Sequence, residues 1–177
     1  GVASIKGWQA YDLNRKSEDS KLLASALKSI ARDKPDTASG ILAKLAQDGS
    51  SGYAVLARFN QAAILAKKGD GKAASGAYLA LSDDSSIDEI MRDMALIMAA
   101  LHGIESGDAV ALSQKLTRLI NGTNAWRHSA KELSALLAQK SGDKAKAQKL
   151  YKELSDDATA PSGIRTRAAE MTAILGG

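Results

Sequence analysis

Two histidines, His102 and His128, are the first residues to test for chemistry, because an imidazole can act as a general base or bind a metal ion. Either role needs further ligands or a nucleophile close by. The two histidines fall in different predicted helices, and neither has such residues around it. The chain also lacks cysteine, which excludes disulfides and thiolate metal sites. We expect structural histidines, no catalytic residue and no metal site.

Two short stretches resemble ligand-binding loops without meeting their requirements. "GDGKAAS" (69–75) has the lysine of a phosphate-binding loop, but Ala73 stands where Ser or Thr is required and Ala66 where the first Gly is required. "DDSSIDE" (83–89) lacks the alternating ligands and central Gly of a calcium loop. We interpret it as a loop that caps a helix beginning near Ile87. The sequence therefore predicts no bound cofactor.

Composition narrows the class of protein. The 177 residues are 45% hydrophobic and 25% charged, which is typical of a soluble globular protein. Ala and Leu dominate and there are only two prolines, a bias that favours helix. The net charge of +4 comes from interspersed acidic and basic residues, so we expect a solvated surface and no nucleic-acid partner. No run of 18 apolar residues exists to span a membrane.

An aromatic pair stands near the start of the chain. Trp8 and Tyr11 are three residues apart, so they lie on one face of any helix there. Such a pair suits the membrane–water interface just after a membrane helix. The other interpretation is a docked N-terminal helix that uses Trp8 as its anchor.

The chain repeats itself, and this repeat organises the fold. "KGDGKAASGAYLALSDD" (68–84) and "SGDKAKAQKLYKELSDD" (141–157) align without a gap at an offset of 73 residues. A third Gly-Asp pair, Gly107-Asp108, lies between Gly69-Asp70 and Gly142-Asp143, with spacings of 38 and 35 residues. These spacings are close to the roughly 34 residues of tetratricopeptide repeats.

The residues around each Gly-Asp pair keep the same register. Small residues come before it, at Ala57, Ala62, Ala95, Ala100, Ala130 and Ala135. After it come Ala74, Tyr78 and Leu81, then Leu112, Leu116 and Leu119, then Ala147, Tyr151 and Leu154. Steps of three and four residues place each set on one stripe of a helix. Each unit is thus predicted as a helix, a Gly C-cap, an Asp N-cap and a second helix.

The register gives an all-α map of four helix pairs and one final helix. The predicted helices cover about residues 17–32 and 36–47, 53–67 and 71–82, 87–104 and 109–120, 125–140 and 144–155, and 163–175. No pair can bury its apolar stripe alone, so the pairs are expected to stack. The last helix aligns with 90–102 through Arg92/Arg165, Ala95/Ala168, Met98/Met171 and Ala100/Ala173. It has no partner and is predicted to cap the stack.

This pattern resembles the tetratricopeptide repeat. The resemblance implies an all-α, tetratricopeptide-like α-solenoid of about four helix hairpins plus a C-terminal capping helix. The chain departs from the consensus in two ways: the early large aromatic of the first helix and the closing Pro are both absent, and "SDD" stands near the closing position.

A narrower resemblance covers nearly the whole chain. The stretches that carry it are "GYAVLARFNQAAILAKKGD" (52–70), "IMRDMALIMAAL" (90–101), "WRHSAKELSALLAQKSGD" (126–143) and "APSGIRTRA" (160–168). They are similar to bacterial tetratricopeptide-like proteins related to the ancillary subunit of the Sec translocon. The resemblance implies one N-terminal transmembrane helix upstream of Gly1, a helical segment at 1–16 and a periplasmic repeat domain at 17–177. Partners implied are the translocon and periplasmic chaperones.

The helix "IDEIMRDMALIMAALHGI" (87–104) is apolar on more than one face, which is typical of a central, buried helix. The second interpretation is that part of it lines a protein-binding groove, since methionine-rich surfaces adapt to varied partners. In tetratricopeptide-like stacks the first helix of each pair lines the concave face. The residues that would face the groove are Leu56, Phe59, Met94, Ile97 and Leu101.

The sequence therefore predicts a non-enzymatic scaffold that binds proteins or peptide segments. The resemblance places it at the periplasmic face of the inner membrane, tethered by its N-terminal anchor. The alternative is a soluble cytosolic adaptor with the same fold. An enzyme is not expected, because no nucleophile–base pair, metal set or cofactor loop is present in the sequence.

Overall fold

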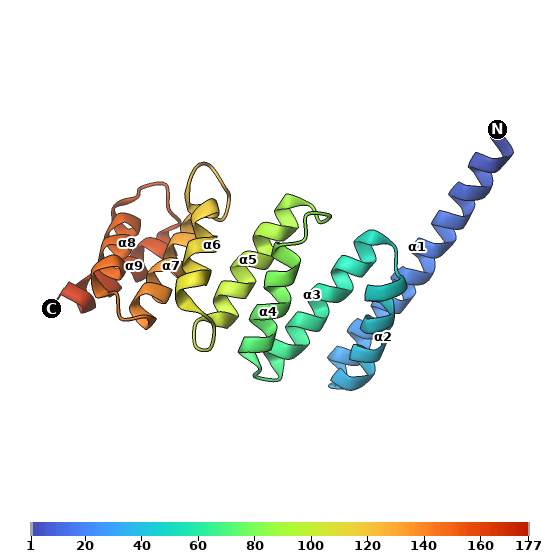
Figure 1. The fold of residues 1–177 in the computed structure, drawn as a ribbon, viewed down its shortest axis with the longest axis horizontal. Coiled ribbons are helices and arrows are strands. Elements are labelled where there is room, and N and C mark those ends of the chain that lie inside the picture. Colours follow the sequence, from blue (N-terminus) through green and yellow to red (C-terminus); the bar gives the residue numbers. More distant parts are fainter. Residues whose placement is uncertain (1, 177) are drawn as a thin grey trace. The chain divides into compact units, whose positions relative to one another are not determined.

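The computed structural model describes residues 2–176, with side chains from Ile5 onward, and this part of the chain contains helices and no strands. It divides into two compact units at Gly69 and Asp70. Figure 1 shows the order of the helices along the chain. Within each unit, helices that neighbour each other in the sequence pack together, as in an α-solenoid.

The first unit contains three helices from residue 2 onward. They are α1 (Val2–Ala31), α2 (Pro35–Asp48) and α3 (Ser51–Lys67). Helix α2 packs against both α1 and α3 around a core of Ala26, Ala38, Leu42, Leu45, Ala57 and Ile64. The described part of the predicted segment 1–16, from Val2, and the predicted helix from residue 17 are one continuous helix, whose N-terminal half extends beyond α2 (Figure 1).

The second unit contains six helices in its described part. They are α4 (Gly71–Ser82), α5 (Glu89–Gly103), α6 (Ala109–Ile120), α7 (Arg127–Lys140), α8 (Lys144–Asp156) and α9 (Ser162–Gly176). Each packs against the next, and α7 also contacts α5 and α9. The predicted repeat made of 53–67 and 71–82 is thus divided, because α3 belongs to the first unit and α4 to the second.

The predicted register of small and large residues is confirmed. The six alanines that were expected before the Gly-Asp pairs and the nine residues expected after them are all buried. The capping helix keeps only part of its register: Ala168 is buried against α8, whereas Ala173 is exposed. Ala173 is exposed because no further helix covers that side of α9 within the described chain.

The predicted Gly-Asp turn is confirmed in full at two of its three positions. Gly69 and Gly142 have φ angles of +83° and +82°, the left-handed conformation that ends a helix. Asp70, Asp108 and Asp143 all cap the following helix through a backbone N–H, at 2.9–3.0 Å. Gly107 differs, because it has no positive φ.

Position 107 requires glycine for a different reason. Its backbone N–H donates to the Gly103 carbonyl at 2.7 Å, and a Cβ atom there would lie 2.7 Å from the same oxygen. Where "RDKPD" replaces the Gly-Asp pair, Asp33 takes the left-handed role with a φ of 56°. The Lys34 N–H then bonds back to the Ser29 carbonyl at 2.9 Å, as in a Schellman motif.

Helices α4 and α5 approach each other closely through small residues. A Cβ atom on Gly71 would lie 2.8 Å from the His102 carbonyl oxygen, and one on Gly103 would lie 2.7 Å from Ser75 Oγ. The Ser75 hydroxyl donates to the Ala99 carbonyl across the same crossing at 2.8 Å. No helix among the described residues is both long and apolar enough to span a membrane.

Two glycines of α4 provide a matched test of this crossing. Gly71→Ala is expected to lower the free energy of unfolding by about 1–3 kcal/mol, because the neighbouring backbone cannot accept the added methyl group. Gly76→Ala meets nothing within 4 Å and is expected to raise it by about 0.5–1 kcal/mol. Urea unfolding measures both, and effects of the same sign would contradict the described α4–α5 packing.

Candidate functional site

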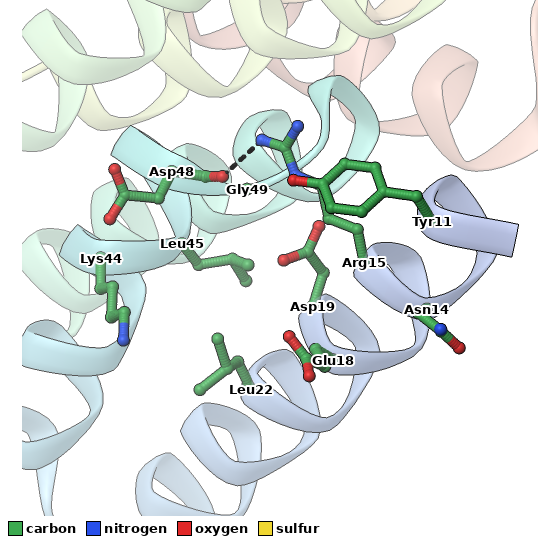
Figure 2. A pocket seen from close by; sticks show the side chains of 10 residues that line it. All are labelled: Tyr11, Asn14, Arg15, Glu18, Asp19, Leu22, Lys44, Leu45, Asp48 and Gly49. Carbon is green, nitrogen blue, oxygen red and sulfur yellow. Dashed lines mark hydrogen bonds between the residues drawn. The ribbon is translucent and has the colours of Figure 1, made fainter. Parts of the chain in front are cut away.

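A groove of about 370 Å³ lies between α1 and the C-terminal end of α2 in the first unit. Figure 2 shows Leu22 and Leu45 directed into the space between the helices, with Tyr11 and Arg15 at its other end. Polar side chains surround this apolar floor: Asn14, Glu18, Lys44 and Asp48. The groove thus offers an apolar surface with charges of both signs at its rim.

Arg15 holds one end of the groove together. Its Nη2 donates to the Asp48 carbonyl oxygen at 2.6 Å (Figure 2). That carbonyl belongs to the last turn of α2, where backbone oxygens lack partners within the helix. A cation there also interacts favourably with the helix dipole.

Asp19 connects α1 to the start of α3. Its side chain is only 6% exposed, and its Oδ2 accepts a hydrogen bond from the Ser50 N–H at 2.8 Å. Ser50 is the N-cap of α3 but makes no capping hydrogen bond with its own side chain. The carboxylate of another helix therefore satisfies one of the free N–H groups at this terminus.

The N-terminal half of α1 exposes its large apolar residues. Ile5, Trp8, Tyr11 and Leu13 are 58–69% exposed. Asp12, which pairs with Lys16 at 2.8 Å, is the first residue of α1 that is even half-buried within the described side chains. Exposed apolar patches are common at interaction sites, which makes this half of α1 a candidate surface.

Trp8 does not anchor a docked helix, since it is 69% exposed. That interpretation of the aromatic pair is wrong. Tyr11 instead lines the groove. A role of the pair at a membrane surface stays a prediction.

The five residues predicted to line a protein-binding groove are divided between the units. Leu56 and Phe59 belong to α3 of the first unit, and Met94, Ile97 and Leu101 to α5 of the second. Leu56 and Leu101 are exposed, whereas Phe59 and Ile97 are only 9% and 8% exposed. Ile97 packs in a core with Leu116 and Leu133, as the buried-helix interpretation of α5 expects. A binding role for the five residues stays a prediction.

His102 and His128 occupy packed positions. His102 stacks on the ring of Tyr78 with centroids 5.7 Å apart. His128 is buried, and its Nε2 lies 3.0 Å from Asp157 Oδ2 and 3.3 Å from Thr159 Oγ1. Both neighbours meet the same ring nitrogen, so the imidazole does not bridge hydroxyl and carboxylate as in a catalytic triad. No cluster of three metal-ligating side chains occurs among the described residues.

The partners of His128 could not be predicted from the sequence. Asp157 and Thr159 follow α8, about thirty residues further along the chain. Asp157 ends the repeated "SDD" and Thr159 lies two residues after it, which is the only feature that distinguishes them in the sequence. The groove residues Arg15 and Asp19 could not be predicted either, because their hydrogen bonds go to backbone atoms of α2 and α3 and leave no pattern of paired side chains.

No protein-family model, curated protein or solved structure matches this chain.

Asp157 makes the stability of the second unit depend on acid pH. Hydrogen bonds from the Thr159 hydroxyl and N–H, and then from His128, lower the pKa of Asp157 from 3.8 to about 2. Because the pKa is lower in the folded state, ionised Asp157 stabilises the fold above pH 3.8 and loses this effect as the pH falls towards 2. Thr159→Ala should raise the pKa towards 3.8, whereas Thr159→Ser should keep it low. An NMR titration of the carboxyl carbon measures both, and an unchanged pKa in Thr159→Ala would refute the assignment.

A second pair of variants tests the connection between α1 and α3. Asp19→Ala is expected to lower the free energy of unfolding by about 1–3 kcal/mol, because it leaves the Ser50 N–H without its partner. Glu18→Ala, at an exposed neighbouring position, should change it by less than about 0.5 kcal/mol. Urea unfolding of both variants gives the comparison, and an equal loss in the two would show that the Asp19 contact contributes nothing of its own.

Proposed function

We propose that this chain is a non-enzymatic scaffold with a tetratricopeptide-like solenoid fold, and that its first unit binds a protein segment along α1. One observation carries the proposal: the exposed residues Trp8 and Tyr11 of α1 lie on the helix face that continues into the groove between α1 and α2, which Tyr11 lines. Both are of the residue types that dominate binding energies at protein interfaces.

The groove determines the kind of segment that fits. An amphipathic segment would cover Trp8 and Tyr11 with its apolar side and place one side chain on the floor formed by Leu22 and Leu45. The rim carries Arg15 and Lys44 beside Glu18 and Asp48, so polar groups of the segment can be oriented by either sign of charge. This arrangement favours a protein partner over a small cofactor.

The location follows from the resemblance to proteins related to the ancillary subunit of the Sec translocon. In this proposal the chain is tethered to the inner membrane, faces the periplasm and connects the translocon with chaperones or client proteins. Trp8 and Tyr11 then lie near the membrane–water interface, where amphipathic rings are favoured.

Site-specific crosslinking tests the proposal. A photoreactive residue at Tyr11, in the full-length protein in its native cells, should give a discrete protein adduct that mass spectrometry identifies. Ile174 is a matched control, since it is an equally exposed apolar residue on α9 (69%). The same adducts from both positions, or none from Tyr11, would contradict a binding surface on α1.

A variant of Trp8 gives the quantitative form of this prediction. Trp8→Ser should reduce the Tyr11 adduct by about tenfold, because an exposed apolar anchor is removed without disturbing the core. Circular dichroism should remain helical. Recovery of the protein and its adduct in the soluble cell fraction alone would support the cytosolic adaptor and overturn the tethered form.

A further inference from the structure

The second unit contains a groove of its own, between α4 and α6. Its volume is about 240 Å³, and it is lined by the side chains of Leu79, Ala111 and Leu112 and by the backbone at Gly76 and Gly107. Its surface is mostly apolar. None of its residues takes part in the groove of the first unit, so the inference below is independent of the function proposed for α1.

The repeat explains why this groove is open. In the repeat register, Gly76 of α4 is equivalent to Gln114 of α6. Likewise, Ala111 of α6 is equivalent to Lys146 of α8. There Lys146 spans from α8 to α6, and its Nζ donates to Ser113 Oγ at 3.1 Å. Between α4 and α6 the same two positions hold no long side chain, so the space that Lys146 crosses elsewhere is empty of protein atoms.

The rim of the groove is also different from its repeat equivalents. Lys72 stands where the other repeats have Val110 and Ala145, and Lys115 stands where the next repeat has the half-buried Leu150. Two cations thus replace apolar residues beside an apolar opening. Packing within the stack does not require this, because the equivalent positions are filled by apolar residues.

The other charged residues near the groove interact with groups other than Lys72, so Lys72 can bind an anion. Lys115 Nζ donates to both carboxylate oxygens of Asp83, at 2.8 and 3.0 Å. The lining acid Asp108 accepts the Ala111 N–H as the cap of α6. Lys72 has no hydrogen-bond or ionic partner among the described residues. A carboxylate entering from solvent would therefore meet an uncompensated cation.

The size of the groove decides what it holds. Pockets for cofactors and drug-sized ligands occupy about 300–1,000 Å³, while an apolar cavity of about 150 Å³ already accepts a benzene ring. At about 240 Å³, this groove fits one apolar side chain rather than a cofactor. We propose that it binds a leucine-sized side chain of an acidic protein segment, with a neighbouring carboxylate of that segment placed on Lys72.

The test uses a defined peptide and the complete 177-residue chain. The probe is the heptapeptide GSELESG, which has one leucine between two glutamates, titrated into the isotope-labelled protein. Two-dimensional NMR should show saturable shifts of the Gly76, Gly107 and Ala111 amides. GSQLQSG, which lacks the carboxylates, should bind at least about fivefold more weakly. GSEAESG, which lacks the apolar side chain, should give no saturable shift.

Matched glycine variants separate binding from folding. Gly76→Leu should weaken binding of GSELESG by at least about tenfold, because the leucine side chain fills the groove. Lys146 occupies the equivalent space between α6 and α8 in the same way. A Cβ atom on Gly76 meets nothing within 4 Å and the leucine side chain enters the open groove, so thermal unfolding should not occur earlier. Gly52→Leu, at an equally open glycine of α3, should bind the peptide as the unchanged protein does.

Charge reversal tests the role of Lys72. The Lys72→Glu variant should no longer bind GSELESG. It should bind GSKLKSG, in which lysines flank the leucine, more tightly than the unchanged protein does. Shifts confined to the first unit, equal binding by Gly76→Leu, or equal binding of GSELESG and GSQLQSG would each overturn the proposal.

Discussion

The close approach of helices at positions that carry a methyl group or no side chain is the constraint on which the rest of this structure depends. At the α4–α5 crossing a Cβ atom on Gly71 would meet the backbone of α5, and one on Gly103 would meet the Ser75 side chain of α4. Elsewhere fully buried alanines such as Ala100 and Ala135 play the same part. Large residues can then fill the space further along each helix. The small residues thus set the distance between helices at which the other side chains pack.

The repeat register could be predicted because it rests on short-range geometry. Steps of three and four residues, a left-handed glycine and a capping aspartate are all local properties of the chain. The division of the chain between α3 and α4 could not be predicted, because it depends on which neighbouring helix each helix packs against, and this is decided by tertiary packing. The turn at Asp33 was equally hidden, since a residue other than glycine there adopts the left-handed conformation.

The candidate sites were harder to predict than the fold for a physical reason. Arg15 and Asp19 bond to backbone atoms far along the chain, and any sequence at Asp48 or Ser50 would supply those atoms. The groove between α4 and α6 leaves a trace only when the repeats are compared, as small residues and lysines where equivalents are long or apolar. The proposed second groove can therefore be recognised in the sequence only where one repeat differs from its neighbours.

The free half of α1 gives the proposed scaffold a temperature-sensitive element. A helix of about a dozen residues is marginal in water when nothing packs against it, because its nucleation is costly. What covers Trp8 and Tyr11 therefore also decides how much of this segment is helical. Helix formation and association become one equilibrium, in which part of the binding enthalpy is offset by ordering of the backbone. Such coupling favours complexes that form selectively and dissociate readily.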